Sequence, residues 1–542
     1  MRLNYTFSSL KKNRQFCILF VAFCIWMGIG IFPLITYESD AMHIIAGANL
    51  LCDNGFTLPP LYCYRYDMQP LSVILIAGMH WAFSFLTCEQ WYCLLTAIAA
   101  YFVIVQSIIF VRKITECSSI LALLALVFFP ESYAIAMYPN TSIFALAVFL
   151  PSMNLILNGK NIFPIVLMCV APLMREEIIS VYPVIFFLFL FRKDTLKRAI
   201  LLSVSYAVIV VSVALSVYWL LDAMPAGTMD TYQYVQPRLV EKVKFTIYTF
   251  YTVVNLILIP IGIWLCINKR RWIILGIALV PMVLLHYIYR YYAGATKHWL
   301  YLLPFVMVLA VYGWQLVIGW CKRFRLLGIG VGIMVLIYLT VSVKIDVKEY
   351  PWYDNPQSVA NCQPSVSLTT FHIAGHHVKI GLGAGQLIPT TDEYMLLTGG
   401  FVYPFYIHNY KNHVVDELND AIAAIDDKKS FNIAMFSWGD NWYLPNYMVT
   451  HGWKVNTAAK KSHVQDLYST LKKNGKTVMT FSRGEIDHFD EKAMEERLDV
   501  WEKHSEPLYL VVNEEKILYI ANELYRKGKL KKLSKICFLV NK

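Results

Sequence analysis

Charged residues are scarce in this chain of 542 residues, since Asp, Glu, Lys and Arg make up 16% of it while hydrophobic residues make up 57%. Soluble domains carry about 25% charged residues. The shortage therefore excludes an ordinary soluble enzyme and indicates a polytopic membrane protein. The net charge of +11 does not point to nucleic acid, because the basic residues stand in short clusters between apolar runs, as membrane topology determinants do.

Metal-binding and nucleotide-binding patterns are missing as well. His372, His376 and His377 have no carboxylate or cysteine at helical spacing beside them, so no metal site is predicted. Gly381–Gly385 (GLGAG) lacks a following Lys-Thr pair and is interpreted as a turn rather than a phosphate loop. The sequence therefore identifies no cofactor with certainty and leaves a requirement for a divalent cation open. Internal repeats, which transporters often contain, are also missing.

Most of the twelve cysteines stand inside apolar runs without metal-ligand spacing, where they act as small hydrophobic residues. Cys52 and Cys63 differ, because both lie in the loop that follows the first apolar run. They are the candidates for a disulfide, and two separate thiols are the alternative.

Long apolar runs dominate the first 343 residues, and about 20 such residues cross a bilayer as a helix. We predict eleven spans, the first of which follows a basic N-terminus and is retained. The predicted spans are Phe16–Thr36, Trp91–Val111, Ser118–Met137, Thr141–Leu157, Asn161–Leu173, Ile178–Phe191, Ala199–Leu221, Thr246–Ile267, Trp272–Tyr289, Trp299–Gly319 and Leu326–Val343.

Charge counting decides two ambiguous segments. If Leu71–Leu86 stays at the surface as a juxtamembrane helix, most basic clusters fall on the side of the N-terminus, whereas a crossing would reverse the bias. One long helix over Asn161–Phe191 would strand Arg175, Glu176 and Glu177 in lipid. Two short spans that meet at an outward-facing break avoid this cost.

These assignments divide the chain into a membrane domain, residues 1–343, and a soluble α/β domain, residues 344–542, on the extracytoplasmic side of the membrane. The outer loop 37–90 carries the juxtamembrane helix. In the soluble domain the patterns predict strands and helices of ordinary length. The strands are Val366–Ile373, Phe431–Phe436 and Leu508–Val512, and the helices are Asp490–Trp501 and Glu514–Lys527.

Seven basic residues of the membrane domain fall on the outer side, against the topology bias. They are Arg65, Arg175, Arg238, Lys242, Lys244, Arg290 and Lys297. An anionic ligand such as a phosphate would explain several of them, because Arg and Lys bind phosphate through charge-assisted hydrogen bonds. Lipid headgroups or salt bridges to Glu176, Glu177, Asp222 or Glu241 are the alternative.

Two acids, Glu38 and Asp40, emerge directly after the first predicted span. A carboxylate at this position suits a general base that acts at the membrane face, and an ordinary solvated loop is the alternative. Aromatic residues also gather on the outer side. Tyr64, Tyr66, Tyr287, Tyr289, Tyr291 and Tyr292 could stack on a sugar or line a lipid groove, or could belong to an interfacial belt.

The order of these motifs resembles a known superfamily. Acids after the first span are followed by Asn49-Leu-Leu and a later Gly, by Tyr64-x-Tyr66 with Pro70-Leu71, by Leu173-Met-Arg-Glu-Glu177 and by Lys297-His-Trp-Leu-Tyr-Leu-Leu-Pro304. This series resembles the GT-C superfamily of polyprenyl-phosphate-dependent glycosyltransferases. More specifically, it looks like the group that contains the protein O-mannosyltransferases and the lipid A aminoarabinose transferases.

The resemblance implies roles for individual residues. Asp40 matches the catalytic acid, with Glu38 as the reserve. Arg175 matches the basic residue that meets the donor phosphate, and Lys297 and His298 match the late motif. Gln69 stands where the family commonly has a lysine, and Arg65 would supply the phosphate contact that this lysine makes. Asn140 replaces a further outer acid. The implied substrate-binding residues are Tyr64, Tyr66, Gln69, Glu176 and Tyr292.

The resemblance implies an inverting glycosyltransferase in the bacterial cytoplasmic membrane, with a cytoplasmic N-terminus. Its partners would be membrane lipid, a polyprenyl-phosphate-linked sugar and a lipid, glycan or protein acceptor on the outer side. An O-antigen polymerase or ligase is one alternative, and a transporter or flippase of lipid-linked sugars is another.

Overall fold

The computed structural model describes the membrane part of the chain in four long stretches and the remainder in shorter ones. The described residues are 44–45, 47–49, 51–52, 55–56, 69–129, 140–220, 251–288, 296–346, 366–373, 376–382, 394–396, 420–421, 423–425, 432–436, 454–455, 471–473, 476–480, 490–501, 507–512 and 515–541. The predicted first span, Phe16–Thr36, lies outside them.

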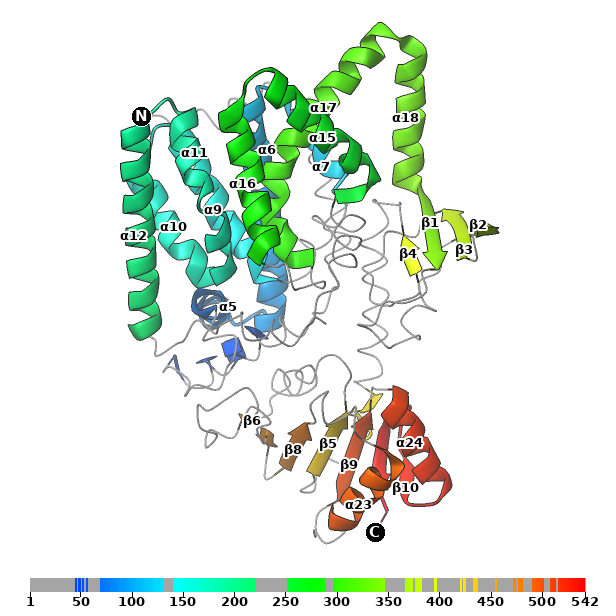
Figure 1. Cartoon of the computed structure of the whole chain (residues 1–542). Coiled ribbons are helices and arrows are strands. Elements are labelled where there is room, and N and C mark those ends of the chain that lie inside the picture. Colours follow the sequence, from blue (N-terminus) through cyan, green and yellow to red (C-terminus); the bar gives the residue numbers. More distant parts are fainter. Residues whose placement is uncertain are drawn as a thin grey trace.

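The membrane part is a bundle whose longer helices run side by side (Figure 1). Its helices are α5 (Pro70–Ala82), α6 (Cys88–Thr115), α7 (Ser119–Val127), α9 (Thr141–Leu157), α10 (Ile162–Met174), α11 (Val184–Phe191), α12 (Leu196–Leu220), α15 (Thr252–Asn268), α16 (Trp272–Ile288), α17 (Leu303–Arg323) and α18 (Arg325–Thr340). Two short 3-10 segments join them, η1 (Glu176–Val181) and η3 (Thr296–Leu302).

Three of these segments are long and apolar enough to cross a membrane: Cys88–Thr115, Leu196–Leu220 and Trp299–Arg323. The other apolar helices have 10 to 17 residues. The predicted total of eleven spans is therefore not confirmed. The positions of two predicted helices agree with the structure. The helix α9 has the predicted bounds, Thr141–Leu157, and α16 begins at the predicted Trp272.

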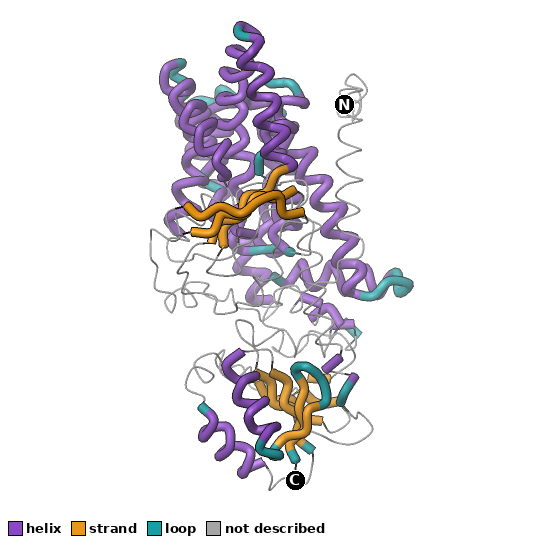
Figure 2. Tube along the Cα trace, turned by 90° about the vertical axis from the view of Figure 1, so that its right-hand side faces the viewer, coloured by secondary structure: helices purple, strands orange, loops and turns teal. Residues whose placement is uncertain are grey.

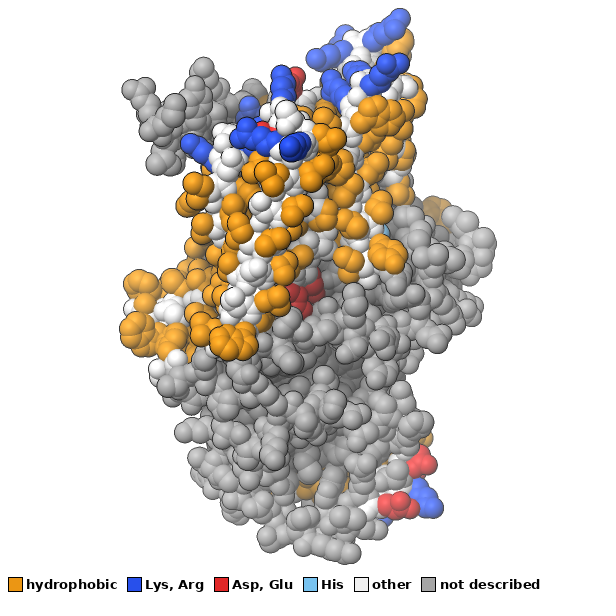
Figure 3. Space-filling view, turned by 60° about the vertical axis from the view of Figure 1, so that its left-hand side comes forward, with side chains coloured by type: hydrophobic (Ala, Val, Ile, Leu, Met, Phe, Trp, Pro, Cys, Tyr) orange, Lys and Arg blue, Asp and Glu red, His pale blue; other side chains and the backbone are white. Residues whose placement is uncertain are grey.

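The bundle surface separates charge from apolar side chains. Figure 3 shows hydrophobic side chains along the helices and Lys and Arg side chains gathered at one end. On α12, for example, Leu201, Leu215 and Trp219 are exposed. Lipid is the solvent that suits such helix sides, and clustered basic residues at one end are typical of a membrane protein's cytoplasmic face.

Local signals set the ends of α6. Thr87 and Gln90 form a capping box, in which the Gln90 amide donates to Thr87 Oγ1 at 3.2 Å and the Thr87 amide donates to Gln90 Oε1 at 3.0 Å. At the other end Glu116 adopts a left-handed φ of 55°, which stops the helix. α6 therefore extends beyond both ends of the predicted run Trp91–Val111.

The segment from Asn161 to Phe191 folds back on itself. α10 ends at Met174, Arg175 is extended with φ −162° and ψ 117°, and η1 and α11 follow. The two ends of the segment meet, because Arg192 Nη1 donates to Asn161 Oδ1 at 2.8 Å. The prediction of two short helices in place of one long helix is confirmed, and the break at Arg175 lies at the end of α10 away from Asn161.

The short helix α5 lies across the end of the bundle. In Figure 1 it is seen nearly along its axis, whereas α9 and α12 run lengthwise through the view. Ser72 Oγ donates to the carbonyl of Met174 at 2.9 Å, so α5 contacts the chain at the break. The helix has 13 residues, and its position at the membrane surface stays a prediction.

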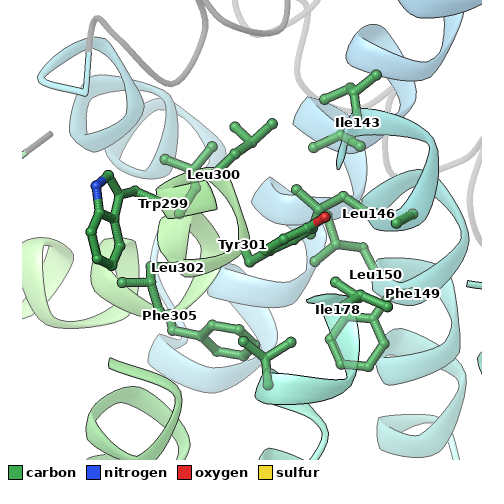
Figure 4. Packing of buried hydrophobic residues seen from close by; sticks show 14 of the residues in the cluster. Ile143, Leu146, Phe149, Leu150, Ile178, Trp299, Leu300, Tyr301, Leu302 and Phe305 are labelled. Carbon is green, nitrogen blue, oxygen red and sulfur yellow. The ribbon is translucent and has the colours of Figure 1, made fainter. Parts of the chain in front are cut away.

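The centre of the core is formed by η3 and α17. Trp299, Leu300, Tyr301 and Leu302 are each at most 2% exposed, and α17 is buried from Leu303 to Trp314. In Figure 4, Trp299 and Tyr301 point to opposite sides of η3, and Tyr301 extends toward Leu146 of α9. One short segment thus contacts two different parts of the bundle.

The C-terminal part begins as soon as α18 ends. The predicted span reached Val343, but the helix stops at Thr340 and β1 (Val341–Asp346) follows. β1 belongs to a four-stranded sheet with order β2-β3-β1-β4. The other strands are β2 (Val366–Ile373), β3 (His376–Leu382) and β4 (Tyr394–Leu396), and all of the pairs are antiparallel.

A second sheet follows, and the two sheets form separate groups of strands in Figure 2. Its order is β10-β11-β9-β5-β8-β7-β6, with β5 parallel to both β8 and β9. Its strands are β5 (Asn432–Phe436), β6 (Lys454–Val455), β7 (Leu471–Lys473), β8 (Lys476–Thr480), β9 (Leu508–Val512), β10 (Leu530–Lys532) and β11 (Cys537–Val540). The helices α23 (Glu491–Trp501) and α24 (Glu515–Arg526) pack on it through residues such as Met494 and Ile517. An α/β composition was predicted, whereas the division into two sheets was not.

Candidate functional site

Buried polar side chains gather where α10 ends, at the end of the bundle that α5 crosses. Gln69 precedes α5, Thr141 begins α9 and Arg175 follows α10, and each is 2% exposed. Burying polar groups costs free energy unless hydrogen bonds replace those lost to water. The partners of these side chains therefore define the site.

The guanidinium of Arg175 is held on two sides. Its Nε donates to Glu177 Oε2 at 2.5 Å and its Nη2 donates to Glu177 Oε1 at 3.3 Å. Its Nη1 donates to Thr141 Oγ1 at 3.1 Å. The two side chains of the ion pair are 2% and 7% exposed, so the pair lies in a region of low dielectric, where charges interact strongly.

Thr141 connects Arg175 to the segment before α5. Its hydroxyl accepts from Arg175 and donates to Gln69 Oε1 at 2.5 Å. A hydroxyl has one proton to donate and lone pairs that accept, so Thr141 can serve both neighbours at once. This relay ties the start of α9, the break after α10 and the start of α5 into one polar unit.

Further polar groups surround the relay. Tyr301 and Ser142 are fully buried, and Tyr301 extends from η3 toward α9 (Figure 4). The hydroxyl of Tyr301 lies near Ser142 and within electrostatic range of Arg175, Glu176 and Glu177. The site is therefore assembled from four segments that are distant in sequence.

The charge balance of this cluster is informative. Among the described side chains around the break, Arg175 supplies one positive charge, and Glu176 and Glu177 supply two negative charges. Glu177 already neutralises Arg175 by direct contact. An anion that approaches Arg175 must therefore compete with the Glu177 carboxylate.

A second polar contact lies on the other side of η3. Tyr251 Oη and His286 Nε2 are 2.7 Å apart, and the His286 ring lies 4.5 Å from the ring of Trp299, measured between centroids. The pair joins the start of α15, the end of α16 and η3. An ionisable side chain in a membrane helix is uncommon and needs a partner, which Tyr251 supplies here.

The structure brings some of the predicted site residues together. Gln69 and Arg175 share Thr141, and Glu176 lies in the same cluster. Lys297 and His298 lie in η3, directly before Trp299, but their side chains are outside the described ones. The predicted residues that lie outside the described ones altogether are Glu38, Asp40, Tyr64, Arg65, Tyr66 and Tyr292.

The structure bears on two predictions that had alternatives. Arg175 forms an ion pair with Glu177, which was one of the salt bridges considered as the alternative to a phosphate. Tyr287 is exposed on α16, which fits both the lipid-groove and the interfacial-belt alternatives. The possible Cys52–Cys63 disulfide is not tested, because Cys63 lies outside the described residues.

Sequence reasoning missed Thr141, Tyr251, His286 and Tyr301. Thr141 could have been noticed, because Asn and Thr are common polar residues at the start of a helix. His286 had another, since it interrupts the apolar run of α16. Which residues they would contact depends on helix packing, which the sequence alone does not give.

The fold of this chain is similar to the GT-C fold of the glycosyltransferase ArnT. Two crystal structures of ArnT from Cupriavidus metallidurans are similar to it over 97% of each chain. The structure bound to undecaprenyl phosphate has a TM-score of 0.57 at 12% identity, and the apo structure has a TM-score of 0.55 at 13% identity. No family model and no curated protein matches the sequence.

ArnT is the lipid A aminoarabinose transferase, so the resemblance inferred from the motifs is confirmed at the level of the fold. At 12–13% identity the likeness concerns the arrangement of elements and not individual side chains. The roles of single residues have to be argued from their own contacts.

Proposed function

We propose that this chain is an inverting glycosyltransferase that moves a sugar from a polyprenyl-phosphate donor to an acceptor outside the cytoplasmic membrane. The observation that carries the proposal is a buried arginine at a helix break in a bundle of the ArnT fold. A guanidinium at low dielectric binds phosphate oxygens strongly and with defined geometry. The similar ArnT structure bound to undecaprenyl phosphate supports a lipid-linked donor.

In the proposed reaction, Asp40 accepts the proton of the acceptor hydroxyl while the oxygen attacks the anomeric carbon. The bond between that carbon and the phosphate oxygen breaks, and polyprenyl phosphate leaves with the electron pair. Arg175 stabilises the charge that develops on the phosphate, supported by Lys297 and Arg65. A single displacement of this kind inverts the anomeric configuration.

The orientation in the membrane is part of the proposal. The end of the bundle that gathers Lys and Arg side chains (Figure 3) would face the cytoplasm. The break at Arg175 lies at the other end and would face outward, together with the C-terminal sheets. The acceptor, a lipid, a glycan or a protein, would then approach from the extracytoplasmic side.

Replacing the proposed base tests the mechanism. Asp40→Asn is expected to lower transfer about 10²- to 10⁴-fold, because removing a general base has effects of this size. Transfer is followed by mass spectrometry of surface glycolipids and glycoproteins in a deletion strain complemented with each variant. Glu89→Gln removes a carboxylate near the start of α6 and is expected to retain activity.

Full activity of Asp40→Asn would refute this mechanism and would favour a polymerase or ligase that relies on arginine and histidine residues. Flux of a lipid-linked sugar through reconstituted protein, without any transfer product, would instead favour a flippase. The expected result is a transfer product that depends on Asp40 and whose anomeric configuration is opposite to that of the donor.

A further inference from the structure

We infer that the carboxylate of Glu177 holds, in the donor-free protein, the place on Arg175 that the donor phosphate takes during the reaction. Glu177 is then an internal competitor that sets how tightly the phosphate is bound and how readily polyprenyl phosphate leaves after transfer. The inference rests on the proposed function, because it requires the phosphate to reach Arg175.

The geometry of the ion pair supports this competition. Glu177 contacts the edge of the guanidinium formed by Nε and Nη2, with one carboxylate oxygen for each nitrogen. A phosphate uses the same two parallel hydrogen bonds when it binds arginine side-on. One edge accommodates one such anion, so a phosphate on this edge displaces Glu177.

The charges around the break give a second reason for displacement. If a phosphate joined Arg175 while Glu177 stayed in place, two anionic groups would contact one buried guanidinium. Like charges repel strongly where the dielectric is low. Movement of Glu177 away from Arg175 relieves this repulsion as the phosphate arrives.

The surrounding structure can keep Arg175 in position during the exchange. Its Nη1 donates to Thr141, which is itself held by Gln69. This contact lies on a different nitrogen from those that hold Glu177. The carboxylate, by contrast, belongs to η1, a 3-10 segment of six residues, and such segments have weaker hydrogen-bond geometry than an α-helix. The acid therefore moves more readily than the arginine.

Glu177→Gln tests the inference directly, since it removes the competing charge and keeps the shape of the side chain. Purified full-length protein in lipid nanodiscs is titrated with undecaprenyl phosphate, and with undecaprenol as the matched probe without phosphate. The variant is expected to bind undecaprenyl phosphate about tenfold more tightly, equivalent to about 1.4 kcal/mol, with undecaprenol unchanged. In the transfer assay, product inhibition by undecaprenyl phosphate is expected to strengthen.

Glu176→Gln is the control matched in charge and chain position. It removes one negative charge from the same segment but leaves the carboxylate that receives the Arg175 hydrogen bonds, so its affinity gain should be several-fold smaller. Equal gains in both variants would overturn the inference, because net charge and not displacement would then explain the effect. No gain in Glu177→Gln would overturn it as well.

Failure of the proposed function gives a different result. If the wild-type protein binds undecaprenyl phosphate no better than undecaprenol, the phosphate site itself is refuted. If it prefers the phosphate but Glu177→Gln does not tighten binding, the internal competition alone is refuted. Should Glu177→Gln fail to fold, Glu177→Asp serves instead, since its shorter side chain weakens the pair and should tighten phosphate binding in the same direction.

Discussion

The contact between α15 and α17 depends on two glycines, and an alanine at either position should destabilise the bundle. A Cβ atom at Gly262 of α15 would lie 2.1 Å from the Leu309 carbonyl oxygen, and one at Gly313 of α17 would lie 2.4 Å from the Leu258 carbonyl oxygen. Each glycine thus faces the backbone of the opposite helix. Close approach of this kind is typical of helix pairs in membranes, where small residues allow backbones to meet.

The size of the effect follows from these distances. Ordinary contacts of a Cβ atom begin at 3.4 Å, so the helices would have to separate by about 1 Å to admit the methyl group. Overpacking costs about 1–3 kcal/mol, while alanine in place of glycine favours a helix by about 1 kcal/mol. Gly330 has nothing within 4 Å of an added Cβ, so Gly330→Ala reports the helix preference alone. Relative to it, Gly262→Ala and Gly313→Ala should lose about 1–3 kcal/mol.

Thermal unfolding in detergent, followed by tryptophan fluorescence, measures this difference. A loss of this size should lower the midpoint by several degrees relative to Gly330→Ala, by about 2–4 °C per kcal/mol. Because η3 leads directly into α17, the same variants should also reduce the binding of undecaprenyl phosphate. Midpoints equal to that of Gly330→Ala would refute the close packing of α15 on α17.

A pair of variants tests the polar relay, and a labelling experiment on the native protein tests the C-terminal sheet. Thr141→Val should destabilise the protein by about 1–3 kcal/mol in thermal unfolding, because Arg175 Nη1 and Gln69 lose their buried partner. Thr141→Ser keeps the hydroxyl and should behave like the wild type. An equal loss of stability in both variants would contradict the relay. Burial raises the pKa of the Cys537 thiol from its ordinary value of 9.0 to about 12, so native protein should resist maleimide at this residue. The stability that the neutral thiol contributes should be complete below pH 9.0 and should decline as the pH rises toward 12. The measurement is mass spectrometry of the C-terminal peptide, with urea-unfolded protein as the control, and rapid labelling of the folded protein would contradict the burial.

Much of the fold could be predicted because hydrophobic runs and charge positions obey simple constraints. The break at Arg175 followed from the cost of charges in lipid, and the Arg192–Asn161 contact shows that the segment does fold back. The strands Val366–Ile373 and Leu508–Val512 matched their apolar patterns to the residue. The end of α18 was misplaced, because the apolar residues Val341 and Val343 suit either a helix or a strand.

The candidate site was less predictable, because its chemistry depends on which side chains contact one another in the folded protein. The sequence suggested Arg175 as a cation for a phosphate, but only packing reveals that Glu177 contacts it and that Thr141 arrives from another helix. The contact of Tyr251 with His286 likewise joins residues 35 positions apart. Composition and spacing identify which groups are present near one face, and tertiary structure decides which of them neutralise one another.

The neutral residue at position 69 has a physical reason in this arrangement. The Thr141 hydroxyl accepts a hydrogen bond from Arg175 and donates its own hydrogen to Gln69 Oε1. A lysine, which the superfamily commonly has at this point, offers donors and no acceptor. It would leave the Thr141 hydroxyl facing two donors and would place a second positive charge beside Arg175. Gln69 therefore supports the guanidinium through Thr141 in place of adding charge.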